Sequence, residues 1–236
     1  MTIKILNAKN IDNTARTYII YANPGVGKTT SIKYIPGKTL LIDIDKSSSV
    51  LAGEDIDIIE VDTYQIWESW MDIVTWLHEP KNIEPYDNVV IDNVTELFRS
   101  ILTQLGREGK NNRVPGMDAY QRADFVTMDS FRALQRLNKR LIFTAWETSD
   151  LWTKPDGQVV NRAMPDIRKP ILNNFLGLAD VVGRLIVARD EEEKEQRGFI
   201  LQPREDVYAK NRLDDRKGCK VEELIAVDDS EHSNDD

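Results

Sequence analysis

The sequence predicts an α/β protein with a mostly parallel central sheet that is flanked by helices. Four short runs of apolar, largely β-branched residues have the composition of strands buried on both faces of a parallel sheet. Apolar residues at helical spacing follow two of these runs, and a glycine-rich segment comes directly after the first run. Such an alternation of strands and helices is typical of a wound α/β sheet.

The predicted strands cover residues 18–22, 39–44, 88–92 and 140–145. Apolar residues at i, i+3, i+4, i+7 and i+10 from Trp67 predict a helix that ends near Pro80. A second amphipathic helix is predicted over residues 119–138. We expect the apolar side of each helix to pack against the sheet.

The pattern changes after residue 145. Residues 148–165 are polar and contain Pro and Gly, which favours a mobile loop, with a solvated surface hairpin as the alternative. Further strands are predicted at residues 179–188, 197–202 and 206–209, with the charged run 190–195 as a hairpin tip. Because no linker interrupts the chain, we expect one domain over residues 1–225 and a disordered acidic tail over residues 226–236.

The composition excludes several classes of protein. Among the 236 residues there is one cysteine, Cys219, which rules out an internal disulfide framework and favours a reducing cytoplasm. With only His78 and His232, zinc clusters and Ser-His-Asp triads are hard to build. No run of about eighteen apolar residues occurs, so we expect no membrane insertion. The net charge of -9 argues against a surface coated in basic residues but allows a local basic site.

The most specific motif follows the first predicted strand. The run Ala22-Asn-Pro-Gly-Val-Gly-Lys-Thr matches the P-loop pattern G-x-x-x-x-G-K-[ST], with Ala22 in place of the first glycine. Glycines allow consecutive backbone N–H groups to face a polyphosphate, while Lys28 reaches the β- and γ-phosphates and Thr29 ligates Mg²⁺. The motif predicts binding of ATP and Mg²⁺, although no motif visible in the sequence distinguishes ATP from GTP. The predicted nucleotide-binding residues are Asn23, Pro24, Gly25, Val26, Gly27, Lys28, Thr29 and Thr30.

Two strands are expected to bring carboxylates to this site. The strand at residues 88–92 ends in Asp92, which fits a Walker B aspartate, so Thr29 and Asp92 are the predicted metal ligands. Asn93 follows where AAA+ ATPases usually carry a catalytic glutamate. The water-activating carboxylate is therefore predicted at Asp45, beyond the strand at 39–44. The alternative is that Asp45 only caps the turn before residues 47–49.

The order of these motifs resembles the RecA-like ATPase core over residues 17–215. The resemblance is greatest to phage-encoded RecA-like NTP-binding proteins of recombination and single-strand annealing modules. It implies a catalytic acid at the end of the strand that precedes the Walker B strand, and the matching positions here are Asp43 and Asp45. It also implies a sensor of the nucleotide state at the end of the strand at 141–145, where Trp146 and Glu147 stand.

The same resemblance implies two DNA-binding segments, residues 106–116 and residues 148–165. Their glycines and basic residues suit phosphate contacts, and an aromatic side chain suits base stacking. The implied DNA-binding residues are Arg107, Lys110, Arg113, Trp152, Lys154 and Arg162.

Lys210 and Arg212 are two residues apart and would share one face of a strand. The resemblance implies that they act in trans as catalytic finger residues on the nucleotide of a neighbouring subunit. An exposed basic pair without that role is the alternative.

The resemblance thus implies a RecA-like ATP-binding protein that acts on single-stranded DNA in phage recombination or replication. It would form a homo-oligomeric ring or filament in the host cytoplasm and hydrolyse ATP between subunits, with a single-strand-binding protein as a further expected partner. Two alternatives remain open: a P-loop kinase of a small metabolite or nucleotide, and a slow nucleotide-dependent regulatory switch.

Overall fold

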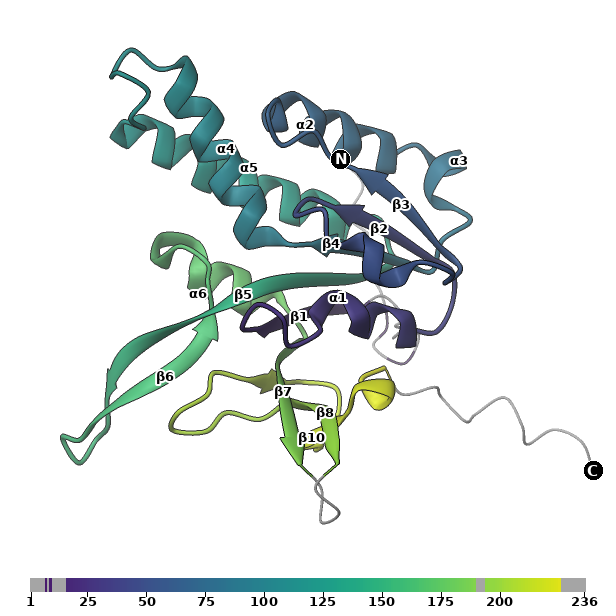
Figure 1. Ribbon diagram of the computed structural model, residues 1–236, viewed down its shortest axis with the longest axis vertical. Helices are drawn as coiled ribbons and strands as arrows, with labels where there is room; N and C mark the ends of the chain where they lie inside the picture. The colour runs from purple at the N-terminus through teal and green to yellow at the C-terminus, as the bar shows by residue number, and fades with distance from the viewer. Residues whose placement is uncertain (1–6, 8, 10–15, 190–193, 226–236) are drawn as a thin grey trace, which may run out of the picture.

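A computed structural model describes residues 7, 9, 16–189 and 194–225 of the chain. Ten strands form one sheet whose main path has the order β10-β8-β7-β1-β5-β4-β2-β3, while β6 pairs with β5 and β9 pairs with β7 (Figure 1). The strands are β1 (Thr17–Ala22), β2 (Thr39–Asp43), β3 (Ile56–Glu60), β4 (Asn88–Asp92), β5 (Arg140–Thr153), β6 (Val159–Pro165), β7 (Val181–Arg189), β8 (Glu195–Ile200), β9 (Lys210–Asn211) and β10 (Gly218–Lys220). From β7 to β3 along this order, neighbouring strands are parallel, which confirms the predicted α/β fold with a mostly parallel sheet.

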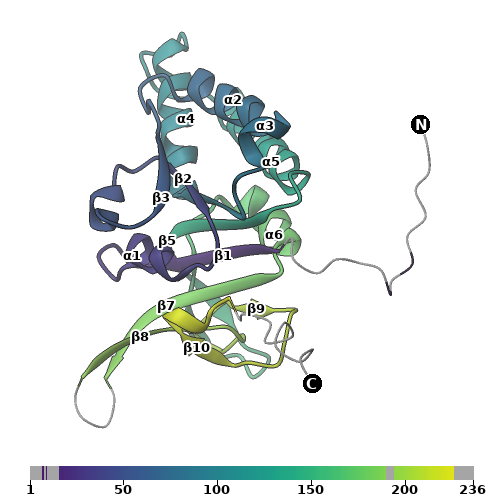
Figure 2. The same ribbon diagram turned by 90° about the vertical axis from the view of Figure 1, so that its right-hand side faces the viewer.

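Helices cover both faces of the sheet (Figures 1 and 2). The helices are α1 (Lys28–Ser31), α2 (Ile66–Leu77), α3 (Pro80–Ile83), α4 (Val94–Glu108), α5 (Met117–Gln135) and α6 (Lys169–Leu178), with 3₁₀ helices η2 (Ile32–Tyr34), η3 (Ser48–Leu51) and η4 (Val221–Glu223). One core joins the sheet to helices α2 to α6. The opposite core joins it to η2, η3 and η4, beside α1.

Alternation along the buried strands decides which side chains face which core. In β1, Ile19 and Tyr21 belong to the core beneath α2 to α6, whereas Tyr18, Ile20 and Ala22 belong to the core on the side of α1. All six residues of β1 are buried, as expected for a central strand of a parallel sheet.

Strand β5 continues beyond the sheet into an arm. Its first part pairs with β1 and β4, and from Glu147 onward it pairs antiparallel with β6, out to the pair Thr153 and Val159. The arm projects from the body of the molecule (Figure 1). The prediction of a mobile loop at residues 148–165 is therefore wrong, and the alternative, a surface hairpin, is what forms, because regular cross-strand pairing extends on both sides of the Pro155 to Gly157 turn.

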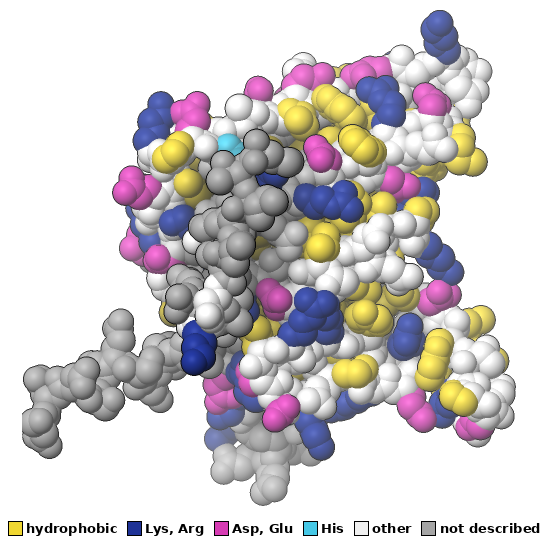
Figure 3. Space-filling model, turned by 180° about the vertical axis from the view of Figure 1, so that it is seen from behind, with side chains coloured by type: hydrophobic (Ala, Val, Ile, Leu, Met, Phe, Trp, Pro, Cys, Tyr) yellow, Lys and Arg dark blue, Asp and Glu magenta, His cyan; other side chains and the backbone are white. Residues whose placement is uncertain are grey.

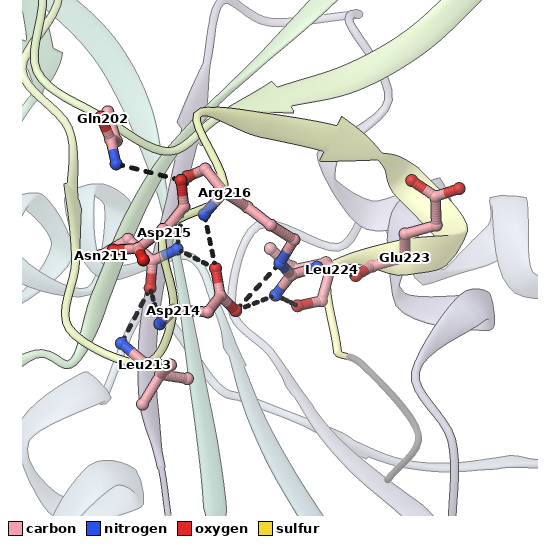
Figure 4. A network of polar contacts seen from close by, with 8 residues as sticks. All are labelled: Gln202, Asn211, Leu213, Asp214, Asp215, Arg216, Glu223 and Leu224. Atoms are coloured by element: carbon pink, nitrogen blue, oxygen red, sulfur yellow. Dashed lines mark hydrogen bonds and ion pairs between the residues drawn. The ribbon is translucent and has the colours of Figure 1, made fainter. Parts of the chain in front are cut away.

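The C-terminal part of the described chain is held by a polar network around Arg216 (Figure 4). The guanidinium of Arg216 pairs with Asp214 at 2.8 Å and donates to the carbonyl oxygen of Glu223 at 2.5 Å and to that of Leu224 at 3.4 Å. Asn211 accepts from the backbone N–H of Leu213 at 2.9 Å. The network ties η4 to the turn that follows β9.

Other boundaries differ from the sequence expectation. The predicted strand at 39–44 ends at Asp43, and the predicted helix at 119–138 spans Met117–Gln135. Residues 206–209 do not form a strand, since Val207 makes isolated bridges to Ala163 and Arg204. Most of the expected hairpin tip at 190–195, and the acidic tail at 226–236, lie outside the described residues. Over the described ranges, no helix is long and apolar enough to cross a bilayer.

Candidate functional site

The P-loop connects the carboxyl end of β1 to α1. Gly25 and Gly27 have φ angles of 83° and 107°, which L side chains rarely adopt, so the loop requires glycine at both places. The backbone N–H of Ser31 donates to the carbonyl oxygen of Gly27 at 2.9 Å and starts the helical turn. The loop thus has the strand, turn and helix order of a phosphate-binding P-loop.

Lys28 is buried at the base of this loop, with 7% of its surface exposed. Its ammonium group donates to the carbonyl oxygens of Ala22 at 3.0 Å and Asn23 at 3.3 Å. Burial lowers the pKa of Lys28, and the carboxylates of Asp92, Asp45 and Glu147 act in the opposite direction. The cation therefore lies in a region surrounded by acidic groups.

Asp92 lies at the end of β4 and accepts hydrogen bonds from three hydroxyl groups of other segments. Its Oδ2 accepts from Thr29 Oγ1 at 2.5 Å and from Ser47 Oγ at 3.1 Å, while Thr144 of β5 donates to Oδ1. Burial is the main cause that raises the pKa of Asp92, the Asp45 carboxylate raises it further, and the three hydroxyl donors lower it. The predicted metal ligands Thr29 and Asp92 are thus in direct contact, and Ser47 joins them.

These oxygen donors fit Mg²⁺. Magnesium in phosphate-transfer sites prefers one or two carboxylates and hydroxyls, with the remaining positions taken by water and phosphate oxygens. Thr29, Ser47 and Asp92 supply such a set beside the P-loop, so they are the residues that would hold the metal ion of a bound Mg-nucleotide.

Asp43 and Asp45 have different surroundings. Both oxygens of Asp43 accept backbone N–H groups, from Ser47 at 3.0 Å and Ser48 at 3.1 Å. Asp43, rather than Asp45, therefore caps the turn after β2. Asp45 accepts from Asn93 Nδ2 at 2.5 Å through Oδ2, while its Oδ1 is buried without a hydrogen-bond partner. Asp45 is the acid of the two that retains an unused acceptor beside Lys28 and Asp92.

A second group of side chains meets at the start of the P-loop, and the sequence did not reveal it. Glu147 follows Trp146, which is in register with Ala22, and Arg184 of β7 is in register with Tyr21. The two side chains meet across β1 in a bidentate ion pair, with distances of 2.8 and 2.7 Å. Asn23 donates to Glu147 at 3.2 Å. Only the position of Glu147 at the end of the predicted strand pointed to this group, because its partner lies 37 residues further along the chain.

Two cavities flank the P-loop. One of about 440 Å³ opens beside Thr30, Tyr34 and Lys220. The other, of about 540 Å³, is polar and opens beside Asn23, Glu147 and Arg184. The first cavity lies beside α1, and the second lies beside the residue that begins the P-loop.

The implied DNA-binding residues differ in how they are held. Lys110 and Arg113 are exposed in the connection between α4 and α5. Arg107 instead donates to the carbonyl oxygen of Tyr64, and its guanidinium carbon lies 3.8 Å from the centre of the Tyr64 ring. In the arm, Lys154 pairs with Glu205 at 2.5 Å and keeps 13% of its side chain exposed.

Arg162, also in the arm, lies over the rings of Trp152 and Tyr208, at 5.3 and 5.5 Å from their centres. Trp152 and Arg162 are therefore packed against each other and against the body of the protein. Both side chains belong to a paired hairpin, and DNA binding by them stays a prediction.

Lys210 and Arg212 lie at the opposite edge of the sheet from the P-loop of their own chain. Lys210 in β9 pairs with Val182 near the start of β7. Its ammonium group donates to the carbonyl oxygens of Leu176, Gly177 and Ala179 at 2.9, 3.0 and 2.5 Å, and Arg212 donates to Gly177 at 2.9 Å. Within the chain the pair caps the end of α6, and its action in trans stays a prediction.

Comparisons with known proteins identify the family. A family model described as an AAA domain matches residues 14–213. Among solved structures, the flagellar accessory protein FlaH from Methanocaldococcus jannaschii is similar at 11% identity over 86% of this chain and 83% of that chain, with a TM-score of 0.45. The KaiC-like protein PH0186 from Pyrococcus horikoshii is similar at 12% identity over 78% and 77%, with a TM-score of 0.42. No curated protein sequence matches the chain. The family match covers the P-loop and Asp92, and the chain therefore belongs to the AAA domain family of P-loop nucleotide-binding proteins.

Proposed function

We propose that this protein is a magnesium-dependent ATPase that acts on single-stranded DNA as a homo-oligomer. The observation that supports the ATPase activity is the convergence of Thr29, Ser47 and Asp92 on one point beside the buried Lys28. A P-loop lysine and a carboxylate-hydroxyl set side by side are the parts that phosphoryl transfer requires.

Bound Mg²⁺ would neutralise charge on the phosphates in this site. Lys28 would exchange the carbonyl oxygens of Ala22 and Asn23 for phosphate oxygens, which are stronger acceptors because they are charged. Asp45 is fixed by Asn93 through Oδ2, so that Oδ1 can accept a hydrogen bond, and then a proton, from the attacking water.

The cavity beside α1 is the proposed place of the nucleoside. It adjoins Thr30, which follows the metal-binding hydroxyl of Thr29, and Tyr34 presents a 40% exposed aromatic side chain to it. Base and ribose would extend from the phosphates into this cavity.

The DNA-binding part of the proposal is supported by Lys110 and Arg113, which are exposed together in the connection between α4 and α5. The face seen in Figure 3 carries Lys and Arg side chains intermixed with Asp and Glu, without one continuous basic stripe. On this face, a short local site for phosphates is therefore better supported than a long basic groove. The expected setting is the cytoplasm, that of the host if the gene belongs to a phage, with a single-strand-binding protein as a further proposed partner.

The decisive experiment measures ATP hydrolysis with and without Mg²⁺ and single-stranded DNA, on size-fractionated protein. We expect Mg-dependent turnover that DNA increases, and no turnover in a Lys28→Ala variant. Transfer of the phosphoryl group to a nucleotide or metabolite would replace the proposal with a kinase. Nucleotide-dependent binding of a protein partner without turnover would replace it with a regulatory switch.

A DNA-binding isotherm at two salt concentrations tests the second part. Neutralising Lys110 and Arg113 together should lower the affinity and reduce the slope of log K against log salt by about one for each DNA phosphate that is no longer neutralised. Removing two exposed lysines elsewhere, by Lys81→Ala and Lys217→Ala, gives a control with the same change of charge. Equal effects of the two double variants, or no binding at low salt with ATP and Mg²⁺ present, would contradict a specific DNA site.

A further inference from the structure

The ion pair between Glu147 and Arg184 joins two strands at the start of the P-loop. Its two strands, β5 and β7, lie on either side of β1. The side chains of Glu147 and Arg184 are 9% and 24% exposed, and both guanidinium nitrogens in the pair donate to separate carboxylate oxygens. Such a fork is the strongest form of contact between an arginine and an anion.

Contacts connect this pair to the phosphate-binding lysine. Lys28 Nζ lies 3.3 Å from the carbonyl oxygen of Asn23, and the side-chain amide of Asn23 lies 3.2 Å from Glu147 Oε1. One P-loop residue therefore separates the Lys28 ammonium group from the ion pair. The pair also borders the polar cavity of about 540 Å³ that opens beside Asn23, so a group bound at the start of the P-loop has space next to Arg184.

Charge makes this arrangement sensitive to the third phosphate. A terminal phosphate carries between one and two negative charges, and it would enter a region where the Glu147 carboxylate already stands. Arg184 offsets this repulsion if it turns toward the phosphate while it stays close to the carboxylate, and the planar fork of arginine binds either group bidentately. ADP ends before this position and leaves the ion pair undisturbed.

We propose that Arg184 is a γ-phosphate ligand supplied by the same chain, and that Glu147 binds and orients its guanidinium group when no ATP is bound. Arg184 then contacts the substrate, while Glu147 is a positioning residue that acts through Arg184. The exchange makes the site discriminate ATP from ADP. This inference rests on the proposed nucleotide binding and extends it to a specific residue.

The test measures the dissociation constants of ATP and ADP, with Mg²⁺, for the full-length protein and its variants. Arg184→Ala should weaken ATP binding about 10- to 100-fold, the equivalent of one strong charged contact, and leave ADP binding within about 2-fold. Arg184→Lys, which keeps the charge but loses the fork, should restore part of the ATP affinity. Glu147→Gln should strengthen ATP binding relative to ADP, because it releases Arg184.

A double variant distinguishes a direct contact between Arg184 and the phosphate from repulsion between Glu147 and the phosphate. If Arg184→Ala acts only by exposing the Glu147 carboxylate, Arg184→Ala combined with Glu147→Gln will recover the wild-type ratio of ATP to ADP affinity. If Arg184 binds the phosphate, the double variant will stay poor at ATP binding. The Arg168 and Asp124 pair is a matched control, since it is also bidentate, with distances of 2.9 and 2.7 Å, but comes from α5 and the segment before α6. Arg168→Ala should not change the ratio.

The outcomes distinguish this inference from the proposed function. If the wild-type protein binds neither ATP nor ADP, both are overturned. If it binds both through Lys28 and Arg184→Ala lowers the two affinities equally, or leaves the ratio unchanged, nucleotide binding stands and the role of Arg184 is refuted.

Discussion

Thr29 Oγ1 lies 2.5 Å from Asp92 Oδ2, although 63 residues separate the two positions in the chain. The contact joins the first turn of α1 to the end of β4. Lys28 is the residue before Thr29, so one helical turn supplies both the phosphate-binding cation and a hydroxyl of the predicted metal site.

Lys28→Ala should therefore abolish nucleotide binding. The loss of a charged contact to two phosphates is expected to weaken affinity by at least about 100-fold. Thr29→Ala should weaken ATP binding in the presence of Mg²⁺ and leave the weaker binding without Mg²⁺ unchanged. Isothermal titration of ATP with and without Mg²⁺ measures both effects, and Lys33→Ala, at an exposed lysine on η2, is the control. Wild-type affinity in both site variants would contradict a P-loop role.

Asp92→Asn should uncouple binding from hydrolysis. The carboxylate is buried among hydroxyl donors, and an amide of equal size keeps the packing but removes the charge that attracts the metal. We expect hydrolysis to fall about 100-fold or more, with some ATP affinity retained through Lys28. A phosphate-release assay over a range of Mg²⁺ concentrations checks this. Turnover at the wild-type rate would place the metal site elsewhere.

Gly27→Ala should lower ATP affinity and thermal stability more than Gly25→Ala does. Both backbones are left-handed, so each alanine costs about 1–2 kcal/mol of strain. At Gly27 the added Cβ would also lie 3.1 Å from Nε of Arg197, whereas nothing lies within 4 Å at Gly25. ATP affinity and thermal unfolding of the two variants give the comparison, and a greater loss in Gly25→Ala would be inconsistent with this geometry.

Lys210→Ala should destabilise the protein. Its ammonium group donates to three carbonyl oxygens at the end of α6, so we expect a loss of about 1–2 kcal/mol in the free energy of unfolding. Urea denaturation measures it, with Arg212→Ala as the neighbouring control that removes a single hydrogen bond. An unchanged midpoint would show that the cap does not stabilise the fold.

The predicted action of Lys210 and Arg212 in trans has a separate test. The double alanine variant should still bind ATP but hydrolyse it poorly, and mixing with Lys28→Ala protein should restore part of the activity. Failure to restore activity despite demonstrated co-assembly, or full activity in a verified monomer, would leave the pair with its capping role alone.

The Cys219 thiol should react slowly with alkylating agents. Burial raises the pKa of Cys219 to about 11, so at pH 8 about one thiol in a thousand is ionised. The rate of iodoacetamide labelling, followed by mass spectrometry, should rise tenfold per pH unit through the usual thiol range. Because the chain has one cysteine, the same protein in urea is the control. Equal rates in folded and unfolded protein would contradict a partly buried thiol with a raised pKa.

The parts of the fold that the sequence predicted are those that carry a local signal. Buried strands such as β1 and β4 are uninterrupted apolar runs, and the P-loop depends on glycines that are near one another in the chain. The strand β3 was missed because it lies at the edge of the sheet, where Asp57 and Glu60 interrupt its apolar pattern. The sequence favours a loop for the arm because Pro155 and Gly157 are turn residues and the flanking residues are polar. The order of the arm comes from cross-strand pairing between residues on both sides of that turn.

The site was predictable to a similar extent. Lys28, Thr29 and Asp92 lie in motifs whose spacing requires them to meet at the carboxyl edge of the sheet. The partnership of Glu147 with Arg184 depends on the strand order, which places β5 and β7 on either side of β1. The bonds from Lys210 to α6 depend likewise on a long-range approach, so neither could be read from nearby residues.

Strand β5 leaves the sheet at the residue that approaches the P-loop. Thr153 at the end of the strand is six residues beyond Glu147, which corresponds to about 20 Å of extended chain. The far end is joined to the body by the ion pair of Lys154 with Glu205, whereas Leu151 and Val159 beside it are exposed. A fluorescent dye at Leu151 or Val159 would therefore measure whether a change at Glu147 breaks that ion pair, from a position about 20 Å along the strand at most.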